Sequence, residues 1–420
     1  MAERVRQEFL HAWNGYKQYA WGHDELRPLN KTSRDWHGET LLMTPVDSLD
    51  TMILMGFNQE AAATREYIAK NLSFDKDIYV KNFEITIRLL GGLLSSYQLT
   101  GDKRLLALAD DLGTRLLPAF RSKTGMSYVH VNLKTGAVRG EVSNPAEIGT
   151  LLVEFGALSK LTGKPVYYDT AKKALVAVYE RRSKIDLVGS GINVETGEWT
   201  DPDSHASGLI DSYYEYLLKG WLLFDDKDCE QMWRASIVAL NKYAADEVNG
   251  TLWYGHVDMN TGARTARHYG ALDAFLPGVL ALGGDIQRAQ RLQESSYAMW
   301  TAYGIEPEQL DYTTMKVTSA GYPLRPEIME SAYILYHFTK DPRYLEMGRT
   351  FFEDLVKHCR TEVGYAALAS VETKEKRDRM ESFFLAETLK YLYLLFAPPD
   401  KLDLKKVIFN TEAHPIQKTW

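Results

Sequence analysis

The sequence predicts an all-α chain built from repeated helical hairpins. Most segments have the periodicity of amphipathic helices joined by short connectors, and one turn pattern recurs along the chain. Leu99-Thr100-Gly101-Asp102 returns one period later as Leu161-Thr162-Gly163-Lys164, and a related turn, Phe338-Thr339-Lys340-Asp341, follows close to three further periods on. Each copy ends an apolar helix at a glycine or polar turn, after which a new helix begins.

A second series of turns lies between the copies of the first. Thr135-Gly136, Thr196-Gly197 and Thr261-Gly262 recur with nearly the same period, and each lies in a run with strand-like alternation. These runs predict small β-hairpins with a glycine at the turn. Each unit of about 60 residues then holds two helices and a hairpin, and seven such units fill the chain. Repeated hairpins bury their apolar faces on neighbours, either in an open solenoid or in a closed α/α barrel with a central cavity.

Composition narrows the class of protein. The chain has 420 residues, a net charge of −7 and no basic run, so we do not expect a nucleic-acid partner. No apolar run is long enough to span a membrane. No linker or low-complexity stretch divides the chain, so we expect one domain over residues 1–420. The two cysteines, Cys229 and Cys359, allow at most one disulfide.

Acidic residues follow the same period as the turns. The series consists of Glu84, Glu147, Asp211, Asp273, Glu327 and Glu387, and Asp47 precedes it. A single acid at a helix start is explained by capping and by the helix dipole. For the whole series we favour a ring of carboxylates at one end of a cavity, because several members have apolar neighbours on both sides.

Two of these acids come with partners that are spaced along a helix. Glu84 and Arg88 are four positions apart and share a helix face, which predicts either a buried ion pair or part of a site. Pro326 marks a helix start and places Glu327 and Glu330 in the first turn. These two acids either cap the helix or form part of a site.

The other segments combine acids with aromatic rings. Phe383 and Glu387 project from one helix face, and Asp211 begins an aromatic run that suits either a sugar platform or a core. Glycoside hydrolysis uses two carboxylates, one protonating the leaving oxygen and the other acting as base or nucleophile. There is no Gly-x-Ser-x-Gly elbow, P-loop, dinucleotide fingerprint or histidine pair at zinc spacing, and we interpret His205 and His268 as structural.

From Phe9 to Pro415 the chain resembles glycoside hydrolase family 47, the class I α-mannosidases. The motifs that carry the resemblance are Asp24-Glu25-Leu26-Arg27-Pro28-Leu29, Val46-Asp47-Ser48-Leu49-Asp50-Thr51, residues 83–93, residues 211–219, Phe275-Leu276-Pro277-Gly278, Arg325-Pro326-Glu327, residues 381–387 and residues 411–415. The resemblance implies an (α/α)7 barrel, inverting exo-hydrolysis of α-1,2-linked mannose from high-mannose N-glycans, and a bound Ca²⁺.

The resemblance also implies roles for individual residues. Glu84 matches the general acid and Glu327 the general base, while Asp211 matches an essential carboxylate that is a rival for the acid role. The residues that match positions around the substrate or the calcium are Arg88, Glu147, Arg325, Glu330, Phe383, Glu387 and Glu412. Thr411 matches the residue that binds Ca²⁺ through its carbonyl and hydroxyl oxygens.

The polar segment 410–415 follows a strand-like run and belongs to no helical repeat. We expect it to plug the barrel and to place Thr411 at the cavity floor, with His414 and Pro415 fixing the turn. Leu209 stands where one-step enzymes of the family carry arginine, which favours broader trimming. Ala271 and Asp273 depart from the pattern of eukaryotic members, which leaves the role of Asp273 open.

Other functions and other cellular locations remain alternatives to this interpretation. A lectin-like, degradation-enhancer-type protein on the same fold would bind mannose glycans without hydrolysing them, and a sugar epimerase would use histidine pairs. The chain start lacks the layout of a signal peptide, so the protein is either cytoplasmic or, as we favour, secreted or periplasmic with its signal removed. We expect a monomer whose partner is a mannose-containing oligosaccharide.

Overall fold

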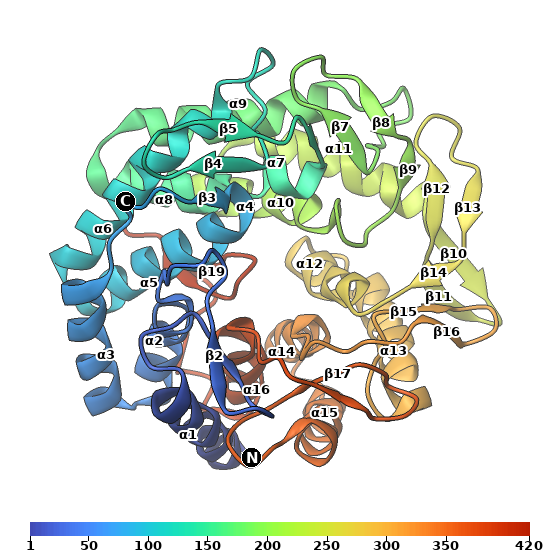
Figure 1. The fold of residues 1–420 in the computed structure, drawn as a ribbon. Coiled ribbons are helices and arrows are strands. Elements are labelled where there is room, and N and C mark those ends of the chain that lie inside the picture. Colours follow the sequence, from blue (N-terminus) through green and yellow to red (C-terminus); the bar gives the residue numbers. More distant parts are fainter. The chain divides into compact units, whose positions relative to one another are not determined.

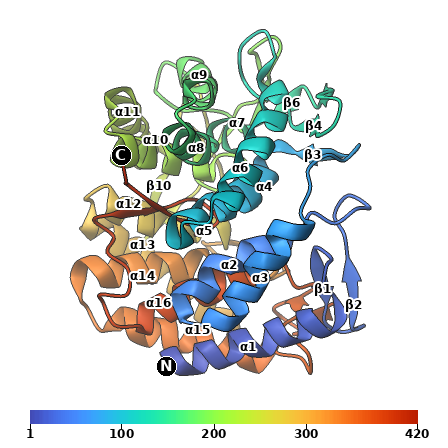
Figure 2. The same cartoon turned by 90° about the vertical axis from the view of Figure 1, so that its left-hand side faces the viewer.

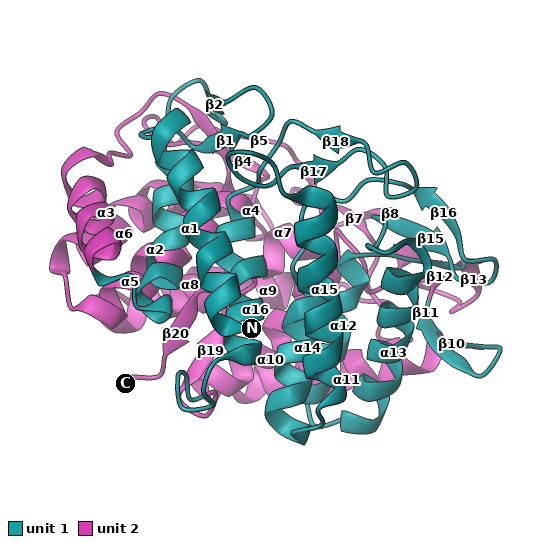
Figure 3. Cartoon of the chain, turned by 90° about the horizontal axis from the view of Figure 1, so that it is seen from below, with its two compact units in different colours: residues 1–58, 246–254, 267–403 teal, residues 59–245, 255–266, 404–420 magenta.

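The computed structural model describes residues 1–420, which form two compact units (Figure 3). Unit 1 comprises residues 1–58, 246–254 and 267–403, and unit 2 comprises residues 59–245, 255–266 and 404–420. Both units are therefore discontinuous in sequence, and each is completed by segments from distant parts of the chain.

Unit 2 consists of helical hairpins joined by small antiparallel sheets (Figure 1). Its helices are α3 (Asn58–Asn71), α4 (Asn82–Ile85), η1 (Thr86–Leu90), α5 (Gly91–Thr100), α6 (Lys103–Leu116), η2 (Leu117–Phe120), α7 (Pro145–Gly149), α8 (Leu152–Thr162), α9 (Pro165–Glu180), α10 (Asp211–Phe224) and α11 (Lys227–Tyr243). Its strands are β3 (Tyr79–Lys81), β4 (His130–Asn132), β5 (Val138–Arg139), β6 (Val142–Ser143), β7 (Gly191–Asn193), β8 (Trp199–Asp201), β9 (Asp203–Ser204), β12 (His256–Asp258), β13 (Arg264–Ala266), β19 (Val407–Phe409) and β20 (Pro415–Gln417).

Unit 1 is built in the same way. Its helices are α1 (Ala2–Tyr19), α2 (Met43–Met55), η3 (Leu272–Phe275), α12 (Leu276–Leu282), α13 (Ile286–Tyr303), α14 (Glu327–Thr339), α15 (Arg343–Cys359), η4 (Phe384–Thr388) and α16 (Leu389–Phe396). Its strands are β1 (Glu25–Arg27), β2 (Thr32–Arg34), β10 (Ala245–Val248), β11 (Thr251–Tyr254), β14 (His268–Tyr269), β15 (Gln309–Asp311), β16 (Lys316–Ser319), β17 (Ala367–Leu368) and β18 (Lys376–Arg377).

The two helices of each hairpin differ in how much of their surface is buried. In α8 every residue from Leu152 to Ser159 is buried, whereas α6 buries Leu105, Ala109, Leu112 and Leu116 along one stripe. The same contrast separates α10 from α11 and α14 from α15. A helix that is apolar all round belongs inside, and a helix with one apolar stripe covers it. The hairpins therefore have an inner and an outer helix, as the repeat predicts.

The repeated turns end helices as the sequence predicts. Gly101, Gly163 and Lys340 all have positive φ angles, of 73°, 72° and 56°, directly after α5, α8 and α14. Each backbone amide bonds a carbonyl in the preceding helical turn. The left-handed conformation at this position closes the last helical turn and redirects the chain.

The Thr-Gly turns form the predicted β-hairpins, and an Asn or Asp side chain fixes each one. In the β4–β5 hairpin, the Oδ1 atom of Asn132 accepts hydrogen bonds from the backbone amides of Lys134 and Thr135 at 3.0 and 2.9 Å. Asn193 and Asp258 do the same in the β7–β8 and β12–β13 hairpins. These side chains replace backbone partners that a short turn leaves unpaired.

The C-terminal hairpin β19–β20 packs inside unit 2. Phe409 pairs with Pro415, and β20 contacts α5 while β19 contacts α10 (Figure 2). Gly91 permits this approach, because a Cβ atom there would lie 2.5 Å from Asn410 Nδ2 and 3.0 Å from His414 Cδ2. The C-terminal segment therefore packs directly against the start of α5.

None of the helices is both long enough and apolar enough to cross a lipid bilayer. Cys229 in unit 2 and Cys359 in unit 1 are buried, and both thiols are free.

Candidate active site

The carboxylates singled out by their spacing lie at equivalent places in the hairpins. In unit 2, Glu84 lies in α4, Glu147 in the first turn of α7, and Asp211 is the first residue of α10. In unit 1, Glu327 is the first residue of α14, and Glu387 lies in η4, which leads into α16. Each acid therefore stands where the chain enters or approaches a buried helix.

In unit 2, Arg88 joins the carboxylates of Glu84 and Glu412. Its Nε and Nη2 atoms donate to Glu84 Oε2 at 3.0 and 2.9 Å, and its Nη1 atom donates to Glu412 Oε1. The side chains of Arg88 and Glu412 are 8% and 3% exposed, but that of Glu84 is 22% exposed. Two carboxylates share one buried guanidinium group, so Glu84 is held at the accessible end of a fixed network.

Arg88 lies on a π-helical turn, η1, between α4 and α5. Such turns widen the helix by one residue and occur frequently at functional sites. A second π-helical turn, η4, carries Glu387 in unit 1. The two wide turns in the structure therefore both carry residues of the predicted site.

The tip of the C-terminal hairpin is fixed by Asn410. Its Nδ2 atom donates to the Ile87 carbonyl and to Glu154 Oε1, both at 2.8 Å. Its Oδ1 atom accepts from the amides of Glu412 and His414 at 3.0 and 2.7 Å. Asn410 and His414 are fully buried, so the turn is held by satisfied polar groups. His414 fixes the turn, as the sequence predicts.

Thr411 stands on this turn with two oxygen atoms that make no hydrogen bond. Its amide donates to the Tyr216 hydroxyl at 3.2 Å, while its carbonyl and hydroxyl oxygens have no hydrogen-bond partner. The next residue, Glu412, accepts a hydrogen bond from Arg88. The turn therefore presents two neutral oxygen atoms beside the Arg88 network.

Below the turn lies a buried acid, Glu154, which accepts hydrogen bonds from the Tyr216 hydroxyl at 2.5 Å and from Asn410. Burial raises the pKa of Glu154 to about 7, although both hydrogen bonds oppose the shift. The carboxyl group connects α8, α10 and the C-terminal hairpin, and it belongs to the support of the site.

We expect Glu154→Gln to become more stable than the native protein as pH rises. The pKa of Glu154 is raised from 4.5 to about 7, so its stabilising contribution is complete below pH 4.5 and declines as pH rises through 7. Glutamine keeps an acceptor oxygen but does not titrate. The difference in unfolding free energy between variant and native protein should grow by about 3 kcal/mol over this range. Urea denaturation from pH 4.5 to 8 measures it, and equal pH slopes in both proteins would contradict the prediction.

Hydrogen bonds link α7, which carries Glu147, to the turn before α10, which Asp211 begins. The Ala146 amide donates to the Leu209 carbonyl at 2.9 Å, and the Thr150 hydroxyl donates to Ser212 Oγ at 2.8 Å. Leu209 is exposed and has a positive φ angle of 78°, which costs free energy for a branched side chain. The structure therefore holds a residue just before the Asp211 helix in a strained and accessible position.

Lys81 is a residue of this region that sequence reasoning missed. Its Nζ atom lies 2.6 Å from Glu147 Oε1, and the lysine side chain is 37% exposed. Lys81 ends β3, directly before the helical segment that carries Glu84. The signal in the sequence that could have identified Lys81 was its position in the chain, close to Glu84.

In unit 1, Arg325 is held by carboxylates on both sides. It donates to both oxygens of Glu308 at 2.9 and 3.1 Å, and its Nη1 atom lies 3.9 Å from Glu327 Oε1. Burial lowers the pKa of Arg325, but the charges of Glu327 and Glu308 outweigh this effect and raise it. Glu308 is the second residue that sequence reasoning missed, because its distance from Arg325 along the chain lies outside the period.

The other predicted residues of unit 1 are buried, and one of them, Phe383, lies against this arginine. Arg325 lies over the Phe383 ring with 5.9 Å to its centroid, and Phe383, Glu330 and Glu387 are 6%, 7% and 6% exposed. Pro326 directly precedes α14, as predicted, which places Glu327 and Glu330 in its first turn. Unit 1 therefore holds an aromatic ring against Arg325 and keeps the carboxyl groups of Glu330 and Glu387 largely buried.

Asp273 has a structural role in unit 1. Its Oδ2 atom accepts a hydrogen bond from the Gly270 amide at 2.9 Å, and the side chain is buried at the start of η3. Asp47 is also buried and accepts a hydrogen bond from the Ser382 hydroxyl. These two acids of the periodic series support loops near the predicted residues.

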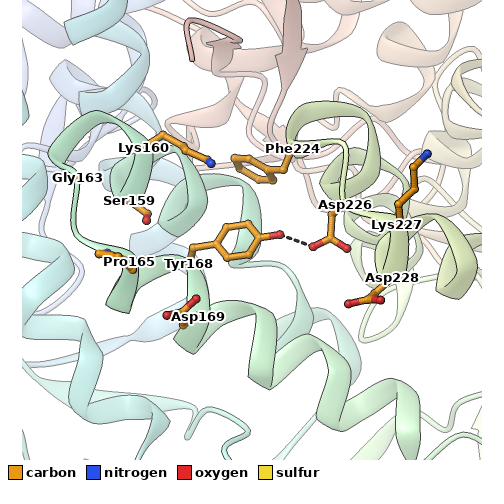
Figure 4. A pocket seen from close by; sticks show the side chains of 10 residues that line it. All are labelled: Ser159, Lys160, Gly163, Pro165, Tyr168, Asp169, Phe224, Asp226, Lys227 and Asp228. Carbon is orange, nitrogen blue, oxygen red and sulfur yellow. Dashed lines mark hydrogen bonds between the residues drawn. The ribbon is translucent and has the colours of Figure 1, made fainter.

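A separate pocket of about 650 Å³ lies in unit 2 between the α8–α9 and α10–α11 turns (Figure 4). The Tyr168 hydroxyl on its wall donates to Asp226 Oδ2. No predicted site residue lines this pocket, so the carboxylate sets and not this pocket define the candidate site.

Comparisons with known proteins agree with this picture. The model of Glycosyl hydrolase family 47 matches residues 8–418. Alpha-mannosidase I MNS4 of Arabidopsis thaliana is 41% identical over 99% of this chain and 69% of its own length. The ER degradation-enhancing alpha-mannosidase-like protein 2 of Mus musculus is 39% identical over 99% of this chain and 77% of its own. The solved alpha-1,2-mannosidase from Trichoderma reesei matches with a TM-score of 0.91 and 28% identity, covering 99% of this chain and 98% of its own.

Helical hairpins that carry carboxylates at or near their starts are consistent with an enzyme of the α/α-barrel glycoside hydrolase class, and the likeness to the Trichoderma reesei enzyme confirms the predicted (α/α)7 fold class. The chain belongs to glycosyl hydrolase family 47. The resemblance carried by the sequence motifs is therefore confirmed.

Proposed function

We propose that this glycoside hydrolase is a Ca²⁺-dependent, inverting exo-α-1,2-mannosidase that removes terminal α-1,2-linked mannose from high-mannose-type glycans, with residues 1–420 acting as one catalytic domain. The observation that carries the proposal is the Thr411 turn, which sets two oxygen atoms without hydrogen bonds beside the Arg88 network. The names of similar proteins, alpha-mannosidase I and alpha-1,2-mannosidase, support the choice of sugar and linkage.

The proposed reaction needs one acid and one base. Glu84 donates a proton to the glycosidic oxygen as the bond to the leaving sugar breaks, and Glu327 accepts a proton from the attacking water. Asp211 is the second candidate for the acid and in either case an essential carboxylate. An inverting enzyme keeps its two carboxyl groups about 6.5–9.5 Å apart so that the water fits between base and sugar.

The remaining predicted residues bind the sugar in this proposal. They are Arg88, Glu147, Arg325, Glu330, Phe383, Glu387 and Glu412. Phe383 offers an apolar ring face, and the carboxylates accept hydrogen bonds from mannose hydroxyls. The arginines keep neighbouring carboxylates in fixed positions, as Arg88 does for Glu84.

The donor set at the Thr411 turn fits a hard cation. Ca²⁺ prefers oxygen ligands and accepts neutral carbonyl and hydroxyl groups together with water. Thr411 has both kinds of oxygen available, and the imidazole of His414 is buried in support of the turn. When bound, the ion would coordinate vicinal hydroxyls of mannose and favour a distorted ring.

We expect removal of calcium to abolish hydrolysis of α-1,2-mannobiose, and addition of Ca²⁺ to restore it. The Thr411→Val variant removes one ligand oxygen without changing the side-chain shape, so calorimetry should show weaker Ca²⁺ binding in this variant. Thr313→Val, on an exposed loop of unit 1, is the matched control. Equal activity with and without chelator would exclude calcium from the mechanism, and glycan binding without turnover would favour a lectin.

A further inference from the structure

We propose that Asp203, His205 and His256 form a binding site for a divalent transition ion such as Zn²⁺, distinct in position and chemistry from the proposed calcium site. One ligand atom of each of the three side chains lies within 4.8 Å of those of the other two. Two imidazoles and one carboxylate are typical ligands of Zn²⁺ and related ions, whereas Ca²⁺ prefers oxygen ligands alone.

The β9–β12 pairing brings the three side chains to one face of a small sheet. Val257 pairs with Ser204 and Asp258 pairs with Asp203, so the next position places His256 opposite His205. Asp203 and His205 are two positions apart and therefore point to the same face. The two imidazole rings lie with their centroids 4.2 Å apart. The strand register thus brings together three potential ligands from two distant segments of the sequence.

The carboxylate is already oriented toward both imidazoles. Asp203 Oδ2 lies 2.6 Å from His256 Nδ1 and 3.8 Å from His205 Nε2. Its other oxygen, Oδ1, accepts a hydrogen bond from the Thr265 hydroxyl at 2.8 Å on strand β13. A polar partner behind a ligand fixes its orientation and raises the affinity of metal sites.

The charges of the cluster also suit a cation at neutral pH. Burial and the neighbouring His256 lower the pKa of His205 to about 4, so its ring is neutral and keeps a lone pair. Burial raises the pKa of Asp203, but hydrogen bonds from His256 and Thr265 outweigh this effect and lower it. The Asp203 carboxylate is therefore ionised. His205 is 5% exposed, whereas Asp203 and His256 are only partly buried, which leaves access from solvent.

Metal binding at this site would act on a backbone turn. The Ser207 amide donates to His205 Nδ1 at 3.1 Å, so the ring proton is on Nε2 in the metal-free protein. A metal-bound imidazole carries its proton on the other nitrogen, so coordination through Nε2 requires the Ser207 amide to release Nδ1. The Ser207 carbonyl accepts from the amides of Ile210 and Asp211 at 3.2 and 2.9 Å. The proposed metal site and the backbone at Asp211, the first residue of α10, are therefore connected through one turn.

The test is titration of the full chain with Co²⁺ while calcium is kept in excess. We expect one equivalent to bind with the visible absorption of a low-coordinate Co²⁺ site, and Zn²⁺ to displace it. His256→Gln and Asp203→Asn should lose this absorption, and Thr265→Val should bind about 10–100-fold more weakly, as expected when a partner behind a ligand is removed. His130→Gln, a histidine of unit 2 outside the cluster, is the matched control and should bind normally.

Two outcomes would overturn the proposal. Binding in His256→Gln that equals binding in the native protein would show that Co²⁺ is held elsewhere, provided that both metal-free proteins melt at the same temperature. Amide hydrogen exchange gives the second check, because release of Nδ1 should speed exchange at Ser207 when Co²⁺ is bound. Unchanged exchange there would remove His205 from the ligand set.

Discussion

Glu84→Gln and Glu327→Gln should each lower kcat for α-1,2-mannobiose by about 10²–10⁴-fold, the usual contribution of a general acid or base. Glutamine keeps the size and one oxygen of each carboxyl group but neither donates nor accepts the required proton. Initial rates of mannose release measure the effect. Glu66→Gln in unit 2 and Glu353→Gln in unit 1 are matched controls, since each is an exposed carboxylate paired with an arginine.

A substrate with a good leaving group separates the acid from the base. The substrate is α-mannosyl fluoride, whose fluoride leaves with little need for protonation. A variant that lacks only the general acid should therefore recover much of its rate on this substrate. We expect recovery in Glu84→Gln and none in Glu327→Gln. Recovery in Asp211→Asn but not in Glu84→Gln would assign the proton to Asp211 instead.

Deletion of residues 410–420 should abolish hydrolysis and sharply lower stability. The deletion removes Thr411 and Glu412, exposes buried Glu154, and leaves Arg88 with one carboxylate fewer. Removing one partner of a buried charge pair alone costs about 3–5 kcal/mol. Thermal unfolding and mannobiose hydrolysis measure the two effects. Deletion of Trp420 alone, a partly exposed ring stacked on Phe224, is the control and should change little.

A single substitution tests the same packing in the full-length chain. Gly91→Ala would place its Cβ atom 2.5 Å from Asn410 Nδ2, so the hairpin tip must move. Overpacking of this kind costs about 1–3 kcal/mol. We expect a lower melting temperature and weaker Ca²⁺ binding in this variant. Gly321→Ala is the comparison for the effect of the mutation type, because Gly321 does not have a left-handed φ angle and a Cβ atom there would meet its nearest neighbours at 3.6 and 3.8 Å, which are ordinary contact distances. Native Ca²⁺ affinity in Gly91→Ala would show that the tip position does not control the cation.

The period of the sequence predicts the fold well because each repeat uses local chemistry. Gly101 and Gly163 end helices for reasons contained within one helical turn, and Asn132 fixes its hairpin through amides that follow it directly in the chain. The same locality explains why Glu84 with Arg88, and Glu327 with its proline, are recognisable from spacing alone.

Two of the features that sequence reasoning missed depend on how loops and strands pair in the fold. Glu308 and Arg325 lie in the same connection between α13 and α14, on either side of the β15–β16 hairpin, and their spacing has no place in the period. The sequence alone gives His205 a structural role and His256 no partner, because the two histidines are far apart in the chain. Their meeting depends on the β9–β12 register, which requires knowing which small strands pair. Spacing along the sequence is therefore a poor guide to which histidines meet in the folded protein.

The discontinuity of unit 2 has a consequence for biosynthesis. Residues 59–245 leave the ribosome long before the segment 404–420 that completes the unit. Until then Glu154 lacks Asn410, Arg88 lacks Glu412, and the surface of α5 has no strand to cover it. A nascent chain of this kind exposes apolar surface and unpaired charge, the condition under which chaperones bind. Native unit 2 therefore forms only after residues 404–420 have been synthesised.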